Sequence, residues 1–183
     1  MESGDRTKYK LADSIKELMK MNPLDKISIK DIVENCGLTR QTFYRHFQDK
    51  YALVNWYFEI LVHDSFEEMK EKKNLRDALI KKFHFIKSER YFFKAAFQSK
   101  DFNSLLEYDY QYILHFYTGV IEKKTQKPLD EEIRFLLEMY CRGSISMTSN
   151  WTIQEMKETP EEMAQLLVEA LPVKLQELLV EFV

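Results

Sequence analysis

The polar side chains best suited to recognising another molecule are concentrated in residues 38–50, where Arg, Gln, Thr, Tyr, His and Lys stand beside two Phe. Successive residues of an α-helix are about 100° apart, so Phe43 and Phe47 share one face while Gln41 and Arg45 lie roughly opposite. Guanidinium and carboxamide groups match the edges of guanine and adenine in the DNA major groove. These residues therefore predict a short helix that buries its aromatics and offers its polar face to DNA.

Two residues at the start of this helix are the predicted base readers. Arg40 suits the O6 and N7 atoms of guanine, and Gln41 suits the N6 and N7 atoms of adenine. The other candidates are predicted to hold phosphates, partly because helix N-termini favour anions. They are Thr42, Tyr44, Arg45, His46, Ser28, Lys50 and Lys30, the last of which reaches either a base or a phosphate. Taken singly, each residue is also compatible with packing or with a solvated helix face, and the combination favours DNA.

The flanking sequence has the end signals of a helix-turn-helix. Ser28 is a suitable N-cap for a second helix, with Asp31 three residues later as its partner in a capping box. Gly37 supplies the left-handed residue that ends this helix, and Thr39 is the predicted cap of the third. The helices predicted for this part of the chain are 5–21, 29–35 and 40–47.

The rest of the chain is predicted to be helical as well, because Gly and Pro are few and short alternating runs bounded by turn residues are lacking. Asp49, Asn74, Asn103 and Thr159 are the predicted caps, and Pro172 should kink or split the final helix. The predicted helices are 50–73, 74–87, 89–98, 103–126, 129–156 and 160–181. The fold class is therefore all-α, with a three-helix head at 1–50 joined through a continuous fourth helix to a larger body at 51–183.

The charge of the chain is distributed unevenly. The net charge is -3 at pH 7, but residues 1–50 carry 10 Lys and Arg against 8 Asp and Glu, which leaves them at +2. Residues 51–183 carry 17 Lys and Arg against 22 Asp and Glu, a net charge of -5. A slightly basic head on an acidic body can bind DNA when its cations face one way.

Other classes of protein find little support in the sequence. The four His lack metal-ligand spacing, and no Gly-rich phosphate loop, nucleophile elbow or paired-carboxylate motif of an enzyme occurs. Cys36 and Cys141 lie far apart and are expected to be reduced thiols. No secretory signal and no apolar run of about 18 residues is found, so we expect a cytoplasmic protein without a membrane span, metal or cofactor.

Residues 37–53 resemble the signature of the TetR-type (TetR/AcrR) transcriptional regulators, and the detailed resemblance covers about residues 5–62. In that signature an aromatic residue, Tyr, His and Phe end the helix and are followed by Lys. The matching residues here are Phe43, Tyr44, His46, Phe47 and Lys50. The run 40–44, with 90–92 and 143–151, further resembles the DhaS-like branch, named for regulators of dihydroxyacetone kinase genes.

The resemblance implies an all-helical homodimer whose two heads bind a near-palindromic operator in double-stranded DNA. It also implies a dimer interface formed by the last two long helices, about 129–156 and 160–181, and a body that responds to a small-molecule effector. Some members of the DhaS-like branch are activators that depend on a partner protein for sensing, which makes a partner protein the alternative source of the signal. Two rival interpretations stay open: a partner-dependent coregulator with weak DNA affinity, and a helical small-molecule-binding or catalytic protein with a vestigial head.

Twelve of the 25 aromatic residues fall within residues 83–117. An aromatic helical core is one interpretation, and a mainly apolar ligand cavity with a few polar groups is the other. The candidate ligand-binding residues are Phe93, Phe97, Tyr112, His115, Phe116, Arg142 and Asn150. The small residues Gly143 and Ser144 predict close helix packing, either at the dimer interface or beside this cavity.

Overall fold

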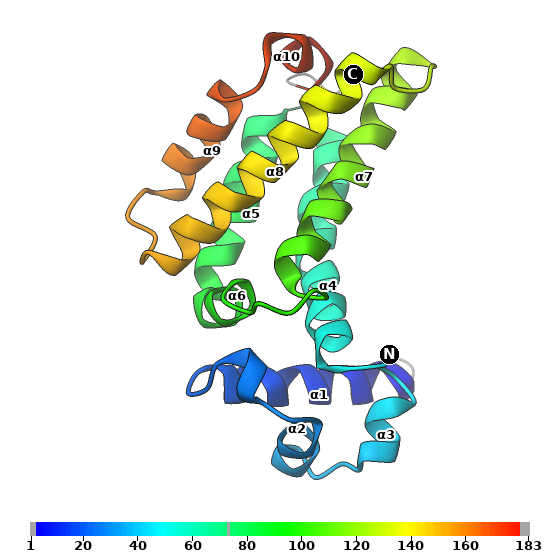
Figure 1. The fold of residues 1–183 in the computed structure, drawn as a ribbon, viewed down its shortest axis with the longest axis vertical. Coiled ribbons are helices and arrows are strands. Elements are labelled where there is room, and N and C mark those ends of the chain that lie inside the picture. The colour runs from blue at the N-terminus through cyan, green and yellow to red at the C-terminus, as the bar shows by residue number, and fades with distance from the viewer. Residues whose placement is uncertain (1–2, 73, 180–183) are drawn as a thin grey trace.

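The computed structural model describes residues 3–72 and 74–179, with side chains described for 5–63 and 74–179. Within these ranges the chain forms ten α-helices, one short 3-10 helix and no strand. The helices build a small head at one end of the molecule and a larger bundle at the other (Figure 1). The predicted all-α fold is confirmed.

The head contains α1 (Ser3–Met19), η1 (Leu24–Lys26), α2 (Ile29–Asn35) and α3 (Arg40–Tyr44). Its apolar faces meet around Leu11, Ile15, Ile32 and Phe43, none of which is exposed to solvent. Ser14 of α1 fixes the crossing of α1 and α2 by donating a hydrogen bond to the carbonyl of Ile32 at 2.7 Å. Helices as short as α2 and α3 are marginal in isolation, so this packing is what holds them.

Local side-chain chemistry sets the ends of the short helices. Ser28 and Asp31 form a reciprocal capping box at the start of α2. Gly37 has a φ of 64°, the left-handed conformation that ends the helix. Thr39 caps α3 by accepting a hydrogen bond from the Thr42 N–H at 3.1 Å. These predicted end signals are confirmed.

The body packs around α4, which leaves the head and passes into the bundle (Figure 1). Its helices are α4 (Lys50–Lys72), α5 (Leu75–Ser88), α6 (Arg90–Phe97), α7 (Leu105–Thr125), α8 (Glu131–Ile153), α9 (Pro160–Glu169) and α10 (Val173–Leu179). α4 packs against α5 and α7, α8 packs against α6 and α7, and α9 lies along α5. Phe83, Phe92 and Phe93 are almost completely buried between these helices, as the interpretation of an aromatic core predicts.

Helix α3 is shorter than predicted. It ends at Tyr44 instead of residue 47, because the His46 N–H turns back to the Phe43 carbonyl at 2.9 Å and tightens the chain. The Phe47 N–H still bonds the same carbonyl at 3.0 Å, so the Phe47 side chain keeps its place in the core.

Other helix ends also differ from the predicted ones. The Asn22 N–H and side chain both donate to the Leu18 carbonyl, so α1 ends two residues early, at Met19. The N-cap of α7 is Ser104 instead of the predicted Asn103. Pro172 splits the final helix into α9 and α10 as predicted, and residues 180–181 of the predicted helix lie outside the described residues.

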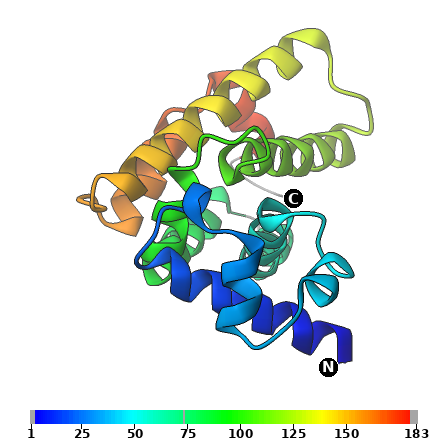
Figure 2. The same ribbon diagram turned by 60° about the horizontal axis from the view of Figure 1, so that its bottom comes forward.

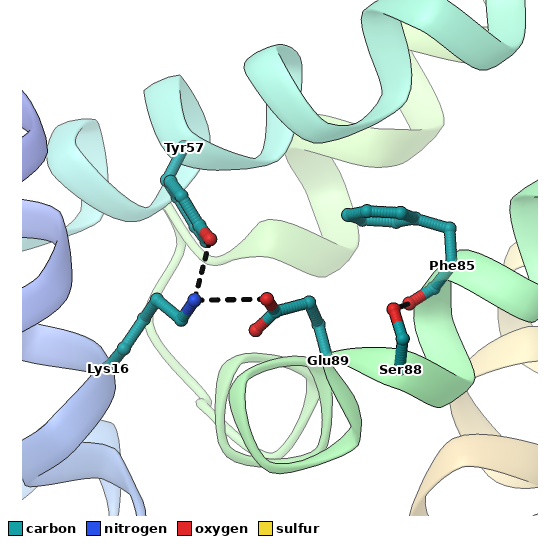
Figure 3. A network of polar contacts seen from close by, with 5 residues as sticks. All are labelled: Lys16, Tyr57, Phe85, Ser88 and Glu89. Carbon is teal, nitrogen blue, oxygen red and sulfur yellow. Dashed lines mark hydrogen bonds and ion pairs between the residues drawn. The ribbon is translucent and has the colours of Figure 1, made fainter.

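A polar contact joins the head to the body. Lys16 of α1 donates to Tyr57 Oη of α4 at 2.7 Å and to Glu89 Oε1, between α5 and α6, at 3.0 Å (Figure 3). Burial by itself would lower the pKa of Lys16, but these two hydrogen bonds raise that pKa above its ordinary value. The lysine therefore stays charged at neutral pH while it links α1 to two segments of the body.

A second contact ties the head to the segment between α6 and α7. Asp25 of η1 accepts hydrogen bonds from Ser99 Oγ at 2.5 Å and from the Lys100 N–H at 3.3 Å. The Ser99 hydrogen bond is the main reason why the pKa of Asp25 is lowered. α6 also packs on α1, and both ribbon views show it beside the C-terminal end of α1 (Figures 1 and 2).

Candidate nucleic-acid interface

Helix α3 presents polar side chains to solvent from a firmly held aromatic base. Arg40, Gln41 and Tyr44 are exposed, whereas Phe43 is fully buried. The Phe43 ring packs edge-on against Tyr44, with 5.7 Å between ring centroids, and lies 5.9 Å from Phe47. The two predicted base readers therefore stand in the first turn of an exposed helix that the core keeps in position.

The remaining candidates in this segment differ in exposure. The Thr42 hydroxyl lies 2.9 Å from Thr39 Oγ1 and is half-buried in the helix cap. Arg45 is exposed on the turn that follows α3, and His46 is half-buried, with its ring centroid 6.5 Å from that of Phe47. Arg45 is therefore an accessible cation, as Arg40 is, while Thr42 and His46 also serve the local fold.

The two candidates from α2 lie at its exposed start. The Ser28 hydroxyl accepts the Asp31 N–H at 3.2 Å and lies 2.7 Å from the Asp31 carboxylate, so it is occupied by the cap. Hydrogen bonding to Ser28 also lowers the pKa of Asp31. Lys30 is exposed, and its ammonium is 3.8 Å from Glu34, a surface pair of little energetic weight. Lys30 is accordingly able to turn toward an approaching anion.

Lys50 is placed differently from the other candidates. Its ammonium donates to the backbone carbonyls of Leu24 (2.9 Å), Asp25 (3.0 Å) and Ile27 (2.8 Å), which uses all three of its N–H donors. Burial is the main reason why the pKa of Lys50 is lowered, against the opposing effect of Asp25 and other nearby carboxylates. In this conformation Lys50 fastens the start of α4 to the end of η1 and does not point outward. Its partners are more than twenty residues away, so no local pattern indicates this role.

The candidate ligand-binding residues do not surround one site. Phe93 and Phe97 are buried, with 5.9 Å between their ring centroids. The ring centroid of Tyr112 lies 5.8 Å from that of Phe58. Phe116 packs beside Tyr117 at 5.6 Å. His115, Arg142 and Asn150 are exposed. The seven residues are thus divided between the aromatic core and the surface.

Arg142 has a structural partner of its own. Its guanidinium donates to both carboxylate oxygens of Glu107, at 2.5 and 3.1 Å, and lies 3.3 Å from the centre of the Tyr110 ring. The bidentate bond from Arg142 is the main reason why the pKa of Glu107 is lowered. This arrangement joins α7 to α8. The guanidinium of Arg142 is therefore already bound to groups of its own chain.

A buried ion pair that no sequence pattern indicates lies in the middle of the body. The Lys82 ammonium lies 3.4 Å from Asp109 Oδ1, and the two side chains are 7% and 0% exposed. Among the described residues, Asp109 Oδ2 has no hydrogen-bond partner. Burial raises the pKa of Asp109, and Lys82 opposes that rise. A cavity of about 10 Å³ beside Lys82, which Tyr117 and Tyr140 also line, is too small for an effector.

The described part of the chain was also compared with the requirements of a membrane span and of a metal site. Its helices are all too short or too polar to cross a lipid bilayer. Among the side chains described, those of 5–63 and 74–179, no three His, Cys, Asp or Glu are grouped in a way that would hold a metal ion.

The geometry of α2, the Gly37 turn and the exposed α3 is that of a helix-turn-helix protein. Residues 11–56 match the family described as bacterial regulatory proteins, tetR family, and residues 73–172 match the family described as transcriptional regulator C-terminal region. The second match spans more than half of the chain. The chain therefore belongs to the TetR family of transcriptional regulators, which confirms the resemblance found in its sequence.

Individual relatives agree with this assignment. The HTH-type dhaKLM operon transcriptional activator DhaS of Lactococcus lactis subsp. lactis (strain IL1403) is 37% identical over 59 residues, which make up 32% of this chain and 32% of that protein. The match thus spans about a third of the length of that relative.

Solved structures share the fold over most of the chain. The Dihydroxyacetone kinase operon activator DhaS has a TM-score of 0.62 at 21% identity, covering 97% of this chain and 98% of that one. A TetR transcriptional regulator from Streptococcus agalactiae 2603V has a TM-score of 0.66 at 20% identity, covering 90% and 92%.

Proposed function

We propose that this chain binds a near-palindromic operator in double-stranded DNA as a homodimer, controlled by a small ligand or a partner protein that acts on the body. The observation that carries the proposal is α3, which exposes Arg40 and Gln41 in its first turn while the fully buried Phe43 holds it to the core. The major groove admits an α-helix, and the N-terminal residues of the second helix contact bases in helix-turn-helix proteins.

The roles of the individual residues follow from where they lie. Arg40 reads guanine and Gln41 reads adenine, since both extend from the first turn of α3. The contacts to phosphates come from α3 and the residues after it, and from the exposed start of α2. These residues are Thr42, Tyr44, Arg45, His46, Ser28 and Lys30. Lys50 positions the start of α4, because its ammonium would have to leave three carbonyls to reach a phosphate.

Arg40→Ala tests the assignment of the base reader. Loss of its bidentate hydrogen bonds should weaken binding to the preferred operator by about 1–3 kcal/mol and relax the choice of base at one position in each half-site. Titration of labelled operators that differ at single positions measures both effects. Lys87→Ala removes an exposed cation from the last turn of α5 and should leave affinity and preference unchanged. Equal operator binding by Arg40→Ala and the unsubstituted chain would remove Arg40 from the interface.

The homodimer is proposed to form through α8 and α9. Large apolar side chains are exposed on these helices: Phe135 (67%), Met139 (54%) and Met147 (52%), which share one face of α8 by their spacing, and Leu166 (53%) on α9. A Cβ placed on Gly143, which lies among them, would meet no atom within 4 Å. The small residue therefore has no close neighbour within its own chain, and a helix from a second chain can approach there. Contiguous exposed apolar surface of this kind marks an interaction site.

Met139→Glu tests this interface. Two-fold symmetry would bring two new carboxylates close together in an apolar contact, which should raise the dimer dissociation constant by about 100-fold or more. Sedimentation velocity over a range of concentrations measures the change. Met21→Glu makes the same substitution at an exposed position before η1 and should leave the dimer intact. A dimer that Met139→Glu leaves as stable as before would show that α8 does not form the interface.

Control by the body is proposed to act through α4 and through the two polar contacts between head and body, those of Lys16 and of Asp25. A signal that displaces α4 also displaces Tyr57 and its hydrogen bond with Lys16, and thereby the head. In a dimer this changes the distance between the two α3 helices and their fit to half-sites about one or more helical turns apart. The signal acts only to the extent that it binds one of the two arrangements more tightly than the other.

A further inference from the structure

A cleft of about 450 Å³ lies where the head meets the body. Three parts of the chain line it: residues 19–23 at the end of α1, residues 90–98 of α6 and the segment after it, and residues 152–156 at the end of α8. Its volume falls within the range of about 300–1,000 Å³ that small-molecule sites occupy. None of the seven ligand-binding candidates from the sequence lines this cleft.

The cleft has a strong excess of positive charge. Lys20, Arg90 and Lys94 line it, against a single acidic residue, Glu155. Among the residues that the structure describes, none of these three cations forms an ion pair. Some basic residues elsewhere on the body do have acidic partners, as Lys174 has in Glu132 at 2.5 Å. In a chain of net charge -3, this grouping leaves the cleft with positive charges that an anion would satisfy.

The cations come from two walls of the cleft, α6 and the segment that follows α1. Arg90 and Lys94 are four residues apart on α6, so both lie on one face of the helix. The Cβ atoms of residues at this spacing are about 5–6 Å apart. Gln98 continues this line and adds a neutral donor, while Lys20 stands on the wall that the head provides. The Arg90 guanidinium lies over the Tyr91 ring at 4.7 Å, which holds its plane in position. A planar guanidinium beside an ammonium suits a phosphate or a carboxylate.

The third wall is rigid. Glu155 and Met156 both have positive φ angles, 72° and 53°, a backbone conformation that few residues other than glycine adopt. The Met156 N–H donates to the carbonyl of Trp151 at 2.9 Å, and Trp151 is itself buried. The end of α8 is therefore fastened to the core beside the cleft, and the site does not depend on a segment that must fold over a ligand.

We infer that this cleft binds a small organic anion with at least two negative charges, either a phosphate ester or a polycarboxylate. The anion bridges Lys20 of the head and the Arg90–Lys94 face of the body. It lies next to the existing link between Lys16 and Glu89 (Figure 3), since Glu89 directly precedes Arg90. Bound anion therefore adds a further tie between the head and the body and restricts the movement of the head. That regulatory consequence rests on the proposed function, but binding itself does not.

DNA phosphate is a less suitable partner for these cations. In both ribbon views the residues that follow α1 lie at one end of that helix and α3 lies near the other end (Figures 1 and 2). A duplex held by α3 would thus be bound on a different part of the molecule from the cleft. DNA binding by the cleft cations is a distinct outcome of the experiment below.

Calorimetric titration of the full chain with pyrophosphate and with citrate, in the absence of DNA, tests the site. We expect saturable binding of at least one probe with one anion per chain, and none of uncharged sucrose. Arg90→Ala/Lys94→Ala should weaken that binding by about tenfold or more, and Lys20→Ala should weaken it from the other wall. The matched control Lys87→Ala/Arg134→Ala removes the same two charges from exposed positions outside the cleft and should bind as before. Preference for pyrophosphate or citrate identifies the phosphate or carboxylate class.

Three results would overturn the inference. The first is that neither probe binds, and the second is an equal loss of affinity in the cleft and control double variants, which would indicate unspecific attraction. The third is that Arg90→Ala/Lys94→Ala loses operator affinity without any anion present, which would assign these cations to DNA. Circular dichroism confirms that each variant is folded. The calorimetric titration itself contains no DNA, so a failure of anion binding is distinguishable from a failure of operator binding by the unsubstituted chain.

Discussion

Replacement of Lys82 by methionine should destabilise the folded chain by about 3–5 kcal/mol, because it leaves the Asp109 carboxylate buried without its cation. The double variant Lys82→Met/Asp109→Leu removes both charges and should recover to within about 1 kcal/mol of the original stability, since apolar packing replaces a buried pair at little cost. Chemical denaturation at neutral pH measures both values. A loss below about 1 kcal/mol in Lys82→Met would show that the pair contributes little to the fold.

The pH dependence of this result has a definite sign. The pKa of Asp109 is raised in the folded state, so the folded state binds a proton more tightly than the unfolded state does. This tighter proton binding stabilises the folded state at pH values below the ordinary carboxyl pKa of 3.8. The stabilisation is lost as pH rises through the pKa that Asp109 has in the folded state. Lys82→Met removes an opposing positive charge and raises that pKa further. The destabilisation caused by Lys82→Met should therefore shrink as the pH is lowered from neutral toward the ordinary carboxyl pKa.

Phe43→Ala should destabilise the head by about 3–5 kcal/mol, the usual cost of truncating a fully buried phenylalanine. α3 is only five residues long and is held by this ring, so its loss should abolish binding to the preferred operator. Hydrogen exchange of the α3 amides and operator titration measure the two effects.

The neighbouring residue provides a matched comparison. Tyr44 is 58% exposed, so Tyr44→Ala should lower stability by about 1 kcal/mol or less while weakening DNA binding through a lost phosphate contact. The two variants thus separate the anchoring of α3 from its contacts. Unaltered stability of Phe43→Ala would contradict the view that this ring holds the recognition helix.

Features set by neighbouring residues were predictable from the sequence. The caps at Ser28, Thr39 and Thr159 and the left-handed turn at Gly37 each depend on side chains within three or four positions. The burial of Phe43 beside exposed Gln41 follows from helical periodicity alone. For this reason the helices of the head, and the exposure of the polar side chains of α3, could be derived from its residues.

Features set by distant residues were not predictable. Lys50 meets carbonyls of residues 24–27, and Lys82 meets Asp109 from another helix, so no spacing in the sequence indicates either contact. The candidate ligand-binding residues of the body have suitable side-chain types, but packing divides them between core and surface. The cleft at the junction requires the ends of α1, α6 and α8 to meet, which only the folded chain shows.

Selection of bound DNA from a random pool, with sizing of the recovered complex, tests the central claim most directly. If two α3 helices read an operator through Arg40 and Gln41, the selected sequences should share a two-fold symmetric motif. Each half-site should contain guanine and adenine in the major groove, and the recovered complex should contain at least two chains per duplex. Recovery of no enriched motif, or of a motif bound by a single chain, would contradict the account.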